Sequence, residues 1–562
     1  MQDRHFPSWP RGCPYSLPPL KTSVYENLEV TARRFPDLPA IIYYGTVLTY
    51  ADLLAAVKKL AGYFHSECGL QRDDRVVLYL QNSPHFVIAY YAALAANAVV
   101  VPVNPMNRAG ELRHILGDTE ARIVVAGQDL LDQALAARAE VQTCRILVAA
   151  YATYRGDAEG LDVPDVVAED AHPVFAPNTV AWTTALATSH DAPAHGRAPE
   201  DWCTIVYSSG TTGQPKGCMH SHATTNAVIL AYANWSTIAP NAAILSTLPL
   251  FHVTGMQNSM NAPIYTGATM VMLSRWNRDN AARLIERHRI AQWRSITTMM
   301  IDFLANPDID AYDLSSLISV GGGGAQMPAA VARKLKAMTG LDYIEGYGLS
   351  ETMAPSHMNP PDGARPQCLG IPLFDVDSRI IDPETLEELG PGKVGEIITS
   401  GPQVFVGYWN QPEATEEAFI EREGKRFFRT GDLGSFDEDG YFYYADRLKR
   451  MINSSGFKVW PAEVEALLHD HPAIQEACVI ASPDPRRGET VKAVIVARKD
   501  VDRPSAEALE EWCRNTMAAY KVPRLFAFVD HLPRSGSGKV MWREMQAAEM
   551  ANATDGIGGG GS

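Results

Sequence analysis

The 562-residue sequence is poor in cysteine, and its eight cysteines form no C-x-x-C pair. Zinc sites and disulfide frameworks space their cysteines closely, so the sequence predicts neither and favours a reducing, cytoplasmic location. Residues 1–15 are polar and include prolines, without the apolar core of a secretory signal. The most apolar stretch, 86–103, is interrupted by Asn97 and Pro102. It predicts a buried helix that runs into a strand rather than a transmembrane segment.

Positive charge is also scarce. The chain has 49 Lys and Arg against 65 Asp and Glu, a formal net charge of −16. A field of that sign repels nucleic acid, so we expect no nucleic-acid partner. The hydrophobic fraction of 46% is ordinary for a globular protein, and the length predicts at least two domains.

Apolar runs of strand length alternate with longer helical patterns as far as Thr399. The examples are strands at 75–80, 99–103 and 122–126 and helices at 51–68 and 86–96. This alternation is typical of an α/β fold with largely parallel sheets. The pattern fades between 151 and 201, which predicts a long surface connection.

The last third of the chain has a different pattern. Residues 394–443 predict a smaller β-rich unit, with turns at 437–440 and 407–408. Residues 461–519 then predict helix, strand, strand and helix, which indicates a separate α+β domain.

The stretch Tyr207–Gly217 combines hydroxyls, three glycines and Lys216. Glycines let a backbone approach an anion, hydroxyls donate hydrogen bonds, and the lysine adds charge, as a polyphosphate loop requires. It is not a Walker A loop, because Pro215 precedes Lys216. We expect a strand at 203–207 before it and a helix opening at Ser221 after it, a geometry that presents free N–H groups to phosphate. The alternative is a flexible surface linker.

A second motif spans Tyr343–Thr352. In it Tyr347 is suited to stack on a flat base, Ser350 to reach a phosphate oxygen, and Glu351 to hold Mg²⁺ with hard oxygen ligands. The alternative is a strand that ends in a turn with a solvated glutamate.

Three further motifs follow in order: Thr430–Gly434, Asp446–Glu465 and Pro533–Val540. Together, and over about residues 23–545, the five motifs resemble the adenylate-forming superfamily. This superfamily contains acyl-CoA synthetases, firefly-type luciferases and the adenylation domains of peptide synthetases.

The resemblance implies a role for each matched residue. It implies ATP or AMP binding by Ser208, Ser209, Gly210, Thr211, Thr212, Gly213, Lys216, Gly346, Tyr347, Gly348, Ser350, Glu351, Asp432, Arg447 and Lys539, with Thr211, Lys216, Glu351 and Lys539 catalytic and Glu351 the Mg²⁺ ligand. It implies a hinge at Lys449 and a coenzyme A tunnel lined by Gly456, Phe457 and Lys458. An acidic residue is commoner where Arg450 stands, so local ion pairing is expected to differ here.

Two segments match the superfamily's acyl pocket. They are 248–255, with His252, Val253 and Thr254, and 319–325, with Gly322, Gly323 and Gly324, and Met299 is a further candidate. We expect His252 to gate the pocket and the glycines to leave room for the acid. A satisfied structural histidine, and plain core packing for Met299, are the alternatives.

The resemblance implies a large N-terminal domain of α/β subdomains plus a β-rich subdomain, and a small mobile α+β C-terminal domain, with the active site between them. The predicted boundaries are 1–445 for the first domain, 446–449 for the hinge, 450–550 for the second domain and 551–562 for a flexible tail.

The implied reaction joins a carboxylic acid to ATP as an acyl-adenylate, with Mg²⁺, and then transfers the acyl group to coenzyme A. We favour a medium- or long-chain fatty acid as substrate. An aryl-acid ligase of the 4-coumarate type and an acyl-AMP ligase that loads a carrier protein stay open. A peptide-synthetase adenylation domain, a luciferase and a non-catalytic sensor are less favoured, and a homodimer is the candidate assembly.

Overall fold

The computed structural model describes residues 4–138, 144–158, 160–174, 176–188, 190–208, 215–454, 457–484, 488–499, 501–534 and 540–557. The chain forms two compact units. Unit 1 comprises Met1–Ser378, Thr399–Phe428 and Asp439–Tyr441, and unit 2 comprises Arg379–Ile398, Arg429–Glu438 and Phe442–Ser562. The boundaries drawn from the sequence at 446–449 stay a prediction.

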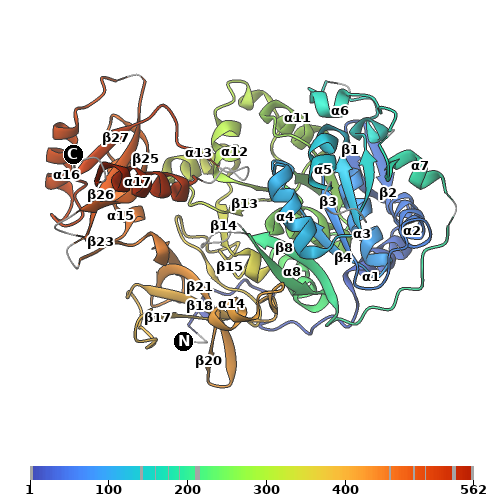
Figure 1. The fold of residues 1–562 in the computed structure, drawn as a ribbon, viewed down its shortest axis with the longest axis horizontal. Coiled ribbons are helices and arrows are strands. Elements are labelled where there is room, and N and C mark those ends of the chain that lie inside the picture. Colours follow the sequence, from blue (N-terminus) through green and yellow to red (C-terminus); the bar gives the residue numbers. More distant parts are fainter. Residues whose placement is uncertain are drawn as a thin grey trace. The chain divides into compact units, whose positions relative to one another are not determined.

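Unit 1 contains two large sheets, which confirm the α/β prediction (Figure 1). The nine-stranded sheet runs in the order β16 (Ile371–Pro372), β15 (His357–Met358), β14 (Tyr343–Tyr347), β13 (Ser319–Gly323), β12 (Gln292–Ser295), β10 (Ala243–Ser246), β11 (Thr269–Met272), β1 (Pro39–Tyr43) and β2 (Thr46–Thr49). The eight-stranded sheet runs β19 (Gly407–Tyr408), β9 (Lys216–Ser221), β8 (Trp202–Ser208), β4 (Val99–Pro102), β3 (Arg75–Tyr79), β5 (Ile123–Gly127), β6 (Arg145–Ala149) and β7 (Thr179–Ala181). The inner pairs are parallel, whereas β9 pairs antiparallel with both β8 and β19.

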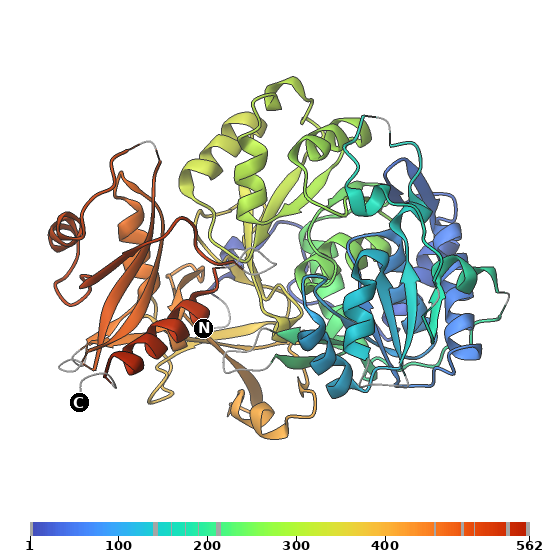
Figure 2. The ribbon, with the colours of Figure 1, turned by 45° about the horizontal axis from the view of Figure 1, so that its top comes forward.

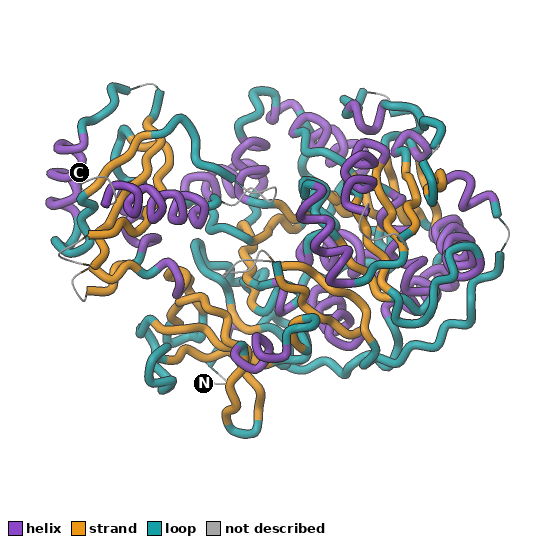
Figure 3. Tube along the Cα trace, viewed as in Figure 1, coloured by secondary structure: helices purple, strands orange, loops and turns teal. Residues whose placement is uncertain are grey.

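Helices cover both faces of these strands, and Figure 3 shows them in purple around the orange strands. The helices of unit 1 are α1 (Val24–Arg34), α2 (Tyr50–Ser66), α3 (Pro84–Ala95), α4 (Ala109–Thr119), α5 (Leu131–Arg138), α6 (Asp165–Ala168), α7 (Trp182–Ala187), α8 (His222–Trp235), α9 (Val253–Met256), α10 (Ala262–Thr266), α11 (Arg278–His288), α12 (Thr297–Leu304), α13 (Ala329–Thr339) and α14 (Pro412–Glu417). Short helical turns are η1 (Phe6–Ser8), η2 (Gln128–Leu130), η3 (Tyr151–Tyr154), η4 (Gln257–Asn261), η5 (Ile309–Ala311) and η6 (Ser350–Thr352).

Strand periodicity explains the packing of β3. Leu78 belongs to the core cluster that contains α2, α3 and strands of the nine-stranded sheet, whereas Val77 belongs to the cluster with α4 and α5. Successive strand residues point to opposite faces, so both faces of the eight-stranded sheet are buried. All twelve residues of α3 are buried, as the apolar stretch predicts. In the described residues, no helix is long and apolar enough to cross a membrane.

The prediction of a surface connection over 151–201 is wrong in part. Strand β7 extends the eight-stranded sheet, and Trp182 of α7 is buried in the core. The segment has few apolar residues, but the sheet edge supplies its backbone partners and a few large side chains anchor it.

Unit 2 contains the predicted α+β domain. Its five-stranded sheet runs β24 (Phe457–Val459), β23 (Ile452–Ser454), β26 (Gly488–Ala497) and β25 (Ile474–Asp484), with β27 (Leu525–Phe528) paired to β26. Its helices are α15 (Pro461–His469), α16 (Ala506–Thr516) and α17 (Trp542–Ile557), and η7 spans Leu448–Arg450. Helix α17 packs along β25 (Figure 2), and it takes in the first residues of the predicted tail.

The predicted β-rich part is a further five-stranded sheet, which contributes residues to both units. Its strands are β17 (Asp377–Ile381), β18 (Gly395–Ser400), β21 (Lys425–Phe436), β20 (Phe419–Arg422) and β22 (Phe442–Arg447).

Candidate active site

The predicted phosphate loop joins two antiparallel strands. Ser208 ends β8 and lies in register with Lys216, which begins β9, and the Ser208 hydroxyl donates to the Lys216 carbonyl at 3.4 Å. The helix expected to open at Ser221 is confirmed as α8, but the expected order of strand, loop and helix lacked β9, whose six residues lie between the loop and α8. Those residues alternate in side-chain direction and find backbone partners on β8 and β19, which favours a strand. Ser221 then caps α8 by accepting a hydrogen bond from the Thr224 N–H at 3.2 Å.

Two predicted site residues, Glu351 and Lys216, both contact Tyr408 of β19. The Tyr408 hydroxyl donates to Glu351 Oε1 at 3.0 Å, and Lys216 Nζ lies 5.0 Å from the centroid of the Tyr408 ring. The sequence suggested only a turn at 407–408, whereas these residues form the strand β19 beside β9. Structure thus brings together two predicted phosphate-site residues, Lys216 and Glu351, through a tyrosine that sequence reasoning missed.

A buried histidine also contacts this region. His220 Nε2 donates to the main-chain oxygen of Ser350 at 2.8 Å, so the turn η6 is tied to β9. Burial lowers the pKa of His220 to about 4, which keeps the ring neutral at physiological pH. No pattern in the sequence distinguishes this histidine from its neighbours, because its partner is 130 residues away.

The predicted adenine-stacking residue Tyr347 ends β14. Its ring is half-buried and lies 5.6 Å from the ring of His357, and its carbonyl accepts from the Ser356 N–H at 2.8 Å. Gly346 and Gly348 flank it, and a Cβ on Gly348 would lie 2.8 Å from Ala354 Cα. Glycine at 348 is therefore required by a close backbone approach.

The glycines of β13 have a reason other than the one expected. A Cβ on Gly322 would lie 1.8 Å from the Ser295 carbonyl oxygen, and one on Gly323 would lie 2.4 Å from that of Gly346. The absence of side chains lets the parallel neighbours β12 and β14 pair closely with β13. Gly324 is exposed and takes a φ of +88°, which a turn out of the strand requires. Strand pairing thus explains Gly322 and Gly323 without a ligand.

The residues expected to gate the acyl pocket lie at the start of α9. His252 is its N-cap, and its Nδ1 accepts from the Thr254 N–H at 3.3 Å. Val253 is fully buried in the core, and Met299 of α12 packs partly buried against the same core. The His252 contact is the one that a structural histidine makes, so the gate stays a prediction.

Two residues predicted to contact ribose lie opposite each other in unit 2. Asp432 of β21 is in register with Arg447 of β22, and Arg447 Nε lies 2.6 Å from Asp432 Oδ1. The Asp432 N–H donates to the Thr430 hydroxyl oxygen at 3.1 Å, and Gly431 between them has a φ of +67°. The Thr-Gly-Asp motif thus lies within β21, where it holds a buried carboxylate beside a guanidinium.

The predicted hinge segment is tied to α15. Asp446 accepts from the N–H groups of Arg447 and Ala462, at 2.7 Å and 2.6 Å. Arg450 pairs with Glu465, donates to the Val479 carbonyl at 3.2 Å and lies 3.7 Å from Asp446. Burial raises the pKa of Asp446, and the nearby Arg450 opposes that shift. Arg450 thus joins a cluster of charges with Glu465 and Asp446, and the expected difference in ion pairing from the family stays a prediction.

The remaining predictions fall partly outside the described residues. Those outside them are Ser209, Gly210, Thr211, Thr212, Gly213, Gly456 and Lys539. The backbone at Lys449 lies in η7, and that at Phe457 and Lys458 in β24.

A Mg²⁺ site fits these residues in one way. Across the ranges that the structure describes, no three His, Cys, Asp or Glu side chains cluster as metal ligands. Mg²⁺ is commonly held by one or two carboxylates together with substrate phosphates and water. Glu351, with one oxygen hydrogen-bonded to Tyr408, fits that arrangement.

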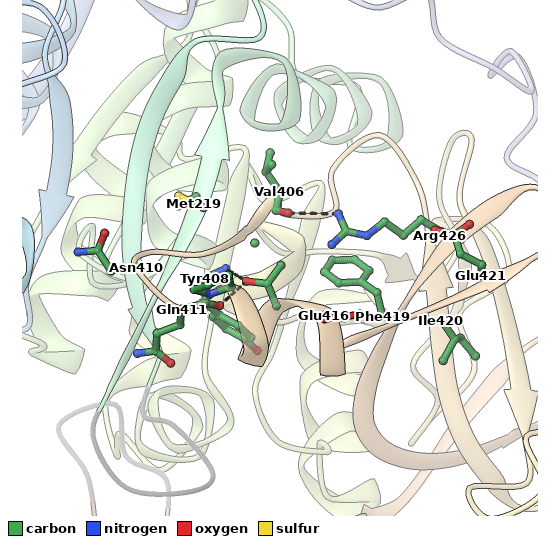
Figure 4. Close-up of a pocket in the computed structure, with 13 residues that line it drawn as sticks. Met219, Val406, Tyr408, Asn410, Gln411, Glu416, Phe419, Ile420, Glu421 and Arg426 are labelled. Atoms are coloured by element: carbon green, nitrogen blue, oxygen red, sulfur yellow. Dashed lines mark hydrogen bonds between the residues drawn. The ribbon is translucent and has the colours of Figure 1, made fainter.

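A cavity of about 710 Å³ lies beside Tyr408 (Figure 4). It is lined by residues of β9, β19, α14, β20 and β21. Its wall includes Met219, Gln411 and Phe419, and the Arg426 guanidinium carbon lies 3.4 Å from the Phe419 ring centroid. Apart from Tyr408, none of the residues discussed above as phosphate-site groups lines this cavity.

Two family models match this chain. Residues 28–409 match the AMP-binding enzyme family, and residues 463–539 match the AMP-binding enzyme C-terminal domain. The chain belongs to the AMP-binding enzyme family. It is an AMP-forming acyl-CoA ligase that uses ATP, Mg²⁺ and coenzyme A, and its substrates are small molecules.

The relatives of this AMP-binding enzyme span almost its whole length. A long-chain-fatty-acid–CoA ligase of Bacillus subtilis is 35% identical over 97% of this chain and 98% of the relative. A feruloyl-CoA synthase of Amycolatopsis sp is 34% identical over 92% of this chain and 96% of the relative. The structure of ATP-bound MatB from Rhodopseudomonas palustris is 29% identical, with a TM-score of 0.82 over 94% of this chain and 99% of that one.

Proposed function

We propose that this AMP-binding enzyme activates a medium- or long-chain fatty acid as acyl-AMP, with release of pyrophosphate, and transfers the acyl group to coenzyme A. The observation that carries the substrate class is the near full-length similarity to a long-chain-fatty-acid–CoA ligase. The chemistry suits the residues, because a carboxylate is a poor electrophile until adenylation provides a leaving group. No enzyme nucleophile is then needed.

The role proposed for each site residue follows from its charge. Lys216 and the hydroxyls of its loop bind phosphate oxygens, and Glu351 holds Mg²⁺, which neutralises phosphate charge. Asp432 accepts hydrogen bonds from the ribose hydroxyls, and Arg447 holds that carboxylate in place. Lys539 spans the attacking carboxylate and the α-phosphate, where it stabilises charge that develops in the transition state.

An aryl acid is the second candidate, because a feruloyl-CoA synthase is almost as similar to this chain. A carrier protein is the alternative acceptor in place of coenzyme A. Neither the glycines of β13 nor the cap at His252 separates these candidates, since both positions have structural reasons.

Mass spectrometry of products separates them. The enzyme is incubated with ATP, Mg²⁺ and one acid at a time, from hexanoate to stearate and including ferulate and benzoate, with and without coenzyme A. We expect fatty acyl-CoA and AMP. Feruloyl-CoA as the main thioester would replace the proposed substrate, and acyl-AMP that is never converted would replace coenzyme A with a carrier.

Lys539→Ala tests the proposed order of steps. We expect adenylation to fall by roughly 10²–10³-fold, as for loss of one transition-state donor, while thioester formation from supplied acyl-AMP is retained. Lys393→Ala, an exposed lysine of unit 2, is the matched control. Equal loss of both half-reactions would refute the assignment of Lys539.

We also propose a cytoplasmic location and a homodimer. The eight cysteines are all free in the structure, which suits a reducing compartment. Cell fractionation and light scattering of the purified enzyme test the two statements separately.

A further inference from the structure

We propose that Tyr408 is a positioning residue for adenylation, which sets the Glu351 carboxylate for Mg²⁺ and the Lys216 ammonium for phosphate. The inference deepens the proposed function and rests on the roles given there to Glu351 and Lys216. It adds a residue from β19, whose sequence marks it only as Gly-Tyr before a loop.

The first contact is with Glu351. The Tyr408 hydroxyl donates to Oε1 at 3.0 Å, and the N–H of Phe405, three residues earlier, donates to the Glu351 main-chain oxygen at 2.8 Å. One short segment therefore holds both the backbone and the side chain of Glu351. With Oε1 engaged by the phenol, rotation of the carboxylate is restricted, which would fix its orientation toward a bound Mg²⁺.

The second contact is with Lys216. Its Nζ lies 5.0 Å from the Tyr408 ring centroid, within the range of a cation–π interaction. Tyr408 is in register with Cys218, which lies two residues from Lys216 on β9 and so projects to the same face. The ring thus supports the lysine at the point where the chain leaves the phosphate loop.

Tyr408 is itself held firmly. Its N–H donates to the Thr415 hydroxyl oxygen at 2.9 Å, and its ring meets the Phe405 ring edge-on with centroids 4.8 Å apart. Tyr408 and Thr415 also line the cavity of Figure 4. The backbone of Tyr408 is held by hydrogen bonding and its ring is held by packing against Phe405. A ring held in this way is suited to orient its neighbours.

Two substitutions separate the two contacts. Tyr408→Phe removes the hydroxyl and keeps the ring, so we expect the Mg²⁺ concentration for half-maximal adenylation to rise about tenfold, as for loss of a hydrogen bond to a charged group. Tyr408→Leu removes both, and we expect the KM for ATP to rise as well, by a few-fold. Tyr441→Phe is the control, because it removes a hydroxyl that donates to the Gly363 carbonyl at 2.9 Å in the same unit.

A binding readout accompanies the kinetics. Mn²⁺ affinity for the enzyme with a non-hydrolysable ATP analogue is measured by electron paramagnetic resonance, after circular dichroism has confirmed the fold. We expect weaker Mn²⁺ binding in Tyr408→Phe by about the same factor and no change in Tyr441→Phe. Wild-type Mn²⁺ affinity in Tyr408→Phe would overturn the inference, and so would wild-type ATP affinity in Tyr408→Leu. If Tyr408→Leu does not fold, the phenylalanine variant decides alone. Failure of the proposed function would appear differently, as absence of acyl-AMP in the wild type.

Discussion

Two carboxylates with predicted roles at the nucleotide are held in different ways. Glu351 of unit 1 accepts a hydrogen bond from a neutral phenol, whereas Asp432 of unit 2 lies against a guanidinium. A phenol orients a carboxylate without adding positive charge, which suits a ligand for Mg²⁺. A guanidinium compensates the charge, which suits a carboxylate that must accept hydrogen bonds from uncharged ribose hydroxyls. Each contact therefore suits the ligand proposed for that carboxylate.

The contrast extends beyond these two residues. In unit 1 the buried histidines His85, His220, His222 and His357 all have a lowered pKa because burial disfavours the charged ring. In unit 2 the buried Arg450 lies between Glu465 and Asp446 and stays charged. Four substitutions or titrations test the comparison.

The largest expected effect is that of Glu351→Gln on rate. The amide oxygen still accepts from Tyr408, so we expect little loss of stability but roughly 10²–10³-fold slower adenylation, because the metal ligand has lost its charge. Pyrophosphate exchange and thermal unfolding measure the two effects. A large drop in melting temperature with little loss of rate would contradict the comparison.

Arg450→Met comes next, and its effect is on stability. The substitution leaves Glu465 and Asp446 without their shared cation in a buried place, so we expect a loss of about 3 kcal/mol in the unfolding free energy of unit 2. Urea unfolding followed by limited proteolysis measures it. The double variant with Glu465→Gln is expected to recover part of the loss, and no recovery would show that packing alone explains it.

Asp432→Asn should cost less. It leaves Arg447 without its counter-charge, but that side chain is 30% exposed and water compensates in part. We expect about 2 kcal/mol of stability to be lost, and the KM for ATP to rise. Adding Arg447→Met should restore stability without restoring the KM. Restored affinity would argue against the ribose role.

The smallest expected effect, counted per pH unit, is the change in the free energy of unfolding with pH. The pKa of His220 falls from 6.5 to about 4 on folding, so below pH 6.5 the unfolded chain takes up a proton that the folded chain refuses. Stability is therefore complete above pH 6.5 and falls, down to about pH 4, by about 1.4 kcal/mol per pH unit for this group. The slope of the unfolding free energy against pH is set by the number of protons taken up on unfolding. His220→Gln should lower that number by one in acid titrations. An unchanged slope would contradict the neutral assignment.

Some of this arrangement follows from the sequence and some does not. The parallel strands and the buried α3 are encoded in local apolar patterns, and they were predicted correctly. The resemblance implied nucleotide-binding roles for Asp432 and Arg447, which the structure places opposite each other on β21 and β22, while those roles stay predictions. Such features depend on residues that are close in sequence.

The features that were missed depend on distant partners. Strand β9 was not predicted between the phosphate loop and α8; it pairs with β8 before it, and its second partner, β19, follows about 190 residues later. The roles of Tyr408 and His220 are set by contacts 57 and 130 residues away. The close backbone approaches at the glycines of β13 were also missed, because a sequence does not reveal which neighbouring carbonyl a Cβ would strike, and their place in an acyl pocket stays a prediction.

Strand β19 has a consequence for how the enzyme is made. Its residues join the edge of the eight-stranded sheet beside β9, yet they are synthesised about 190 residues after Lys216. At typical translation speeds that interval is on the order of 10–40 seconds. During this time the unpaired edge of β9 can form hydrogen bonds with strands of other chains. The nascent chain therefore carries the β8–β9 hairpin without β19 for about a third of elongation, and the arrival of β19 both covers the edge of β9 and brings in Tyr408.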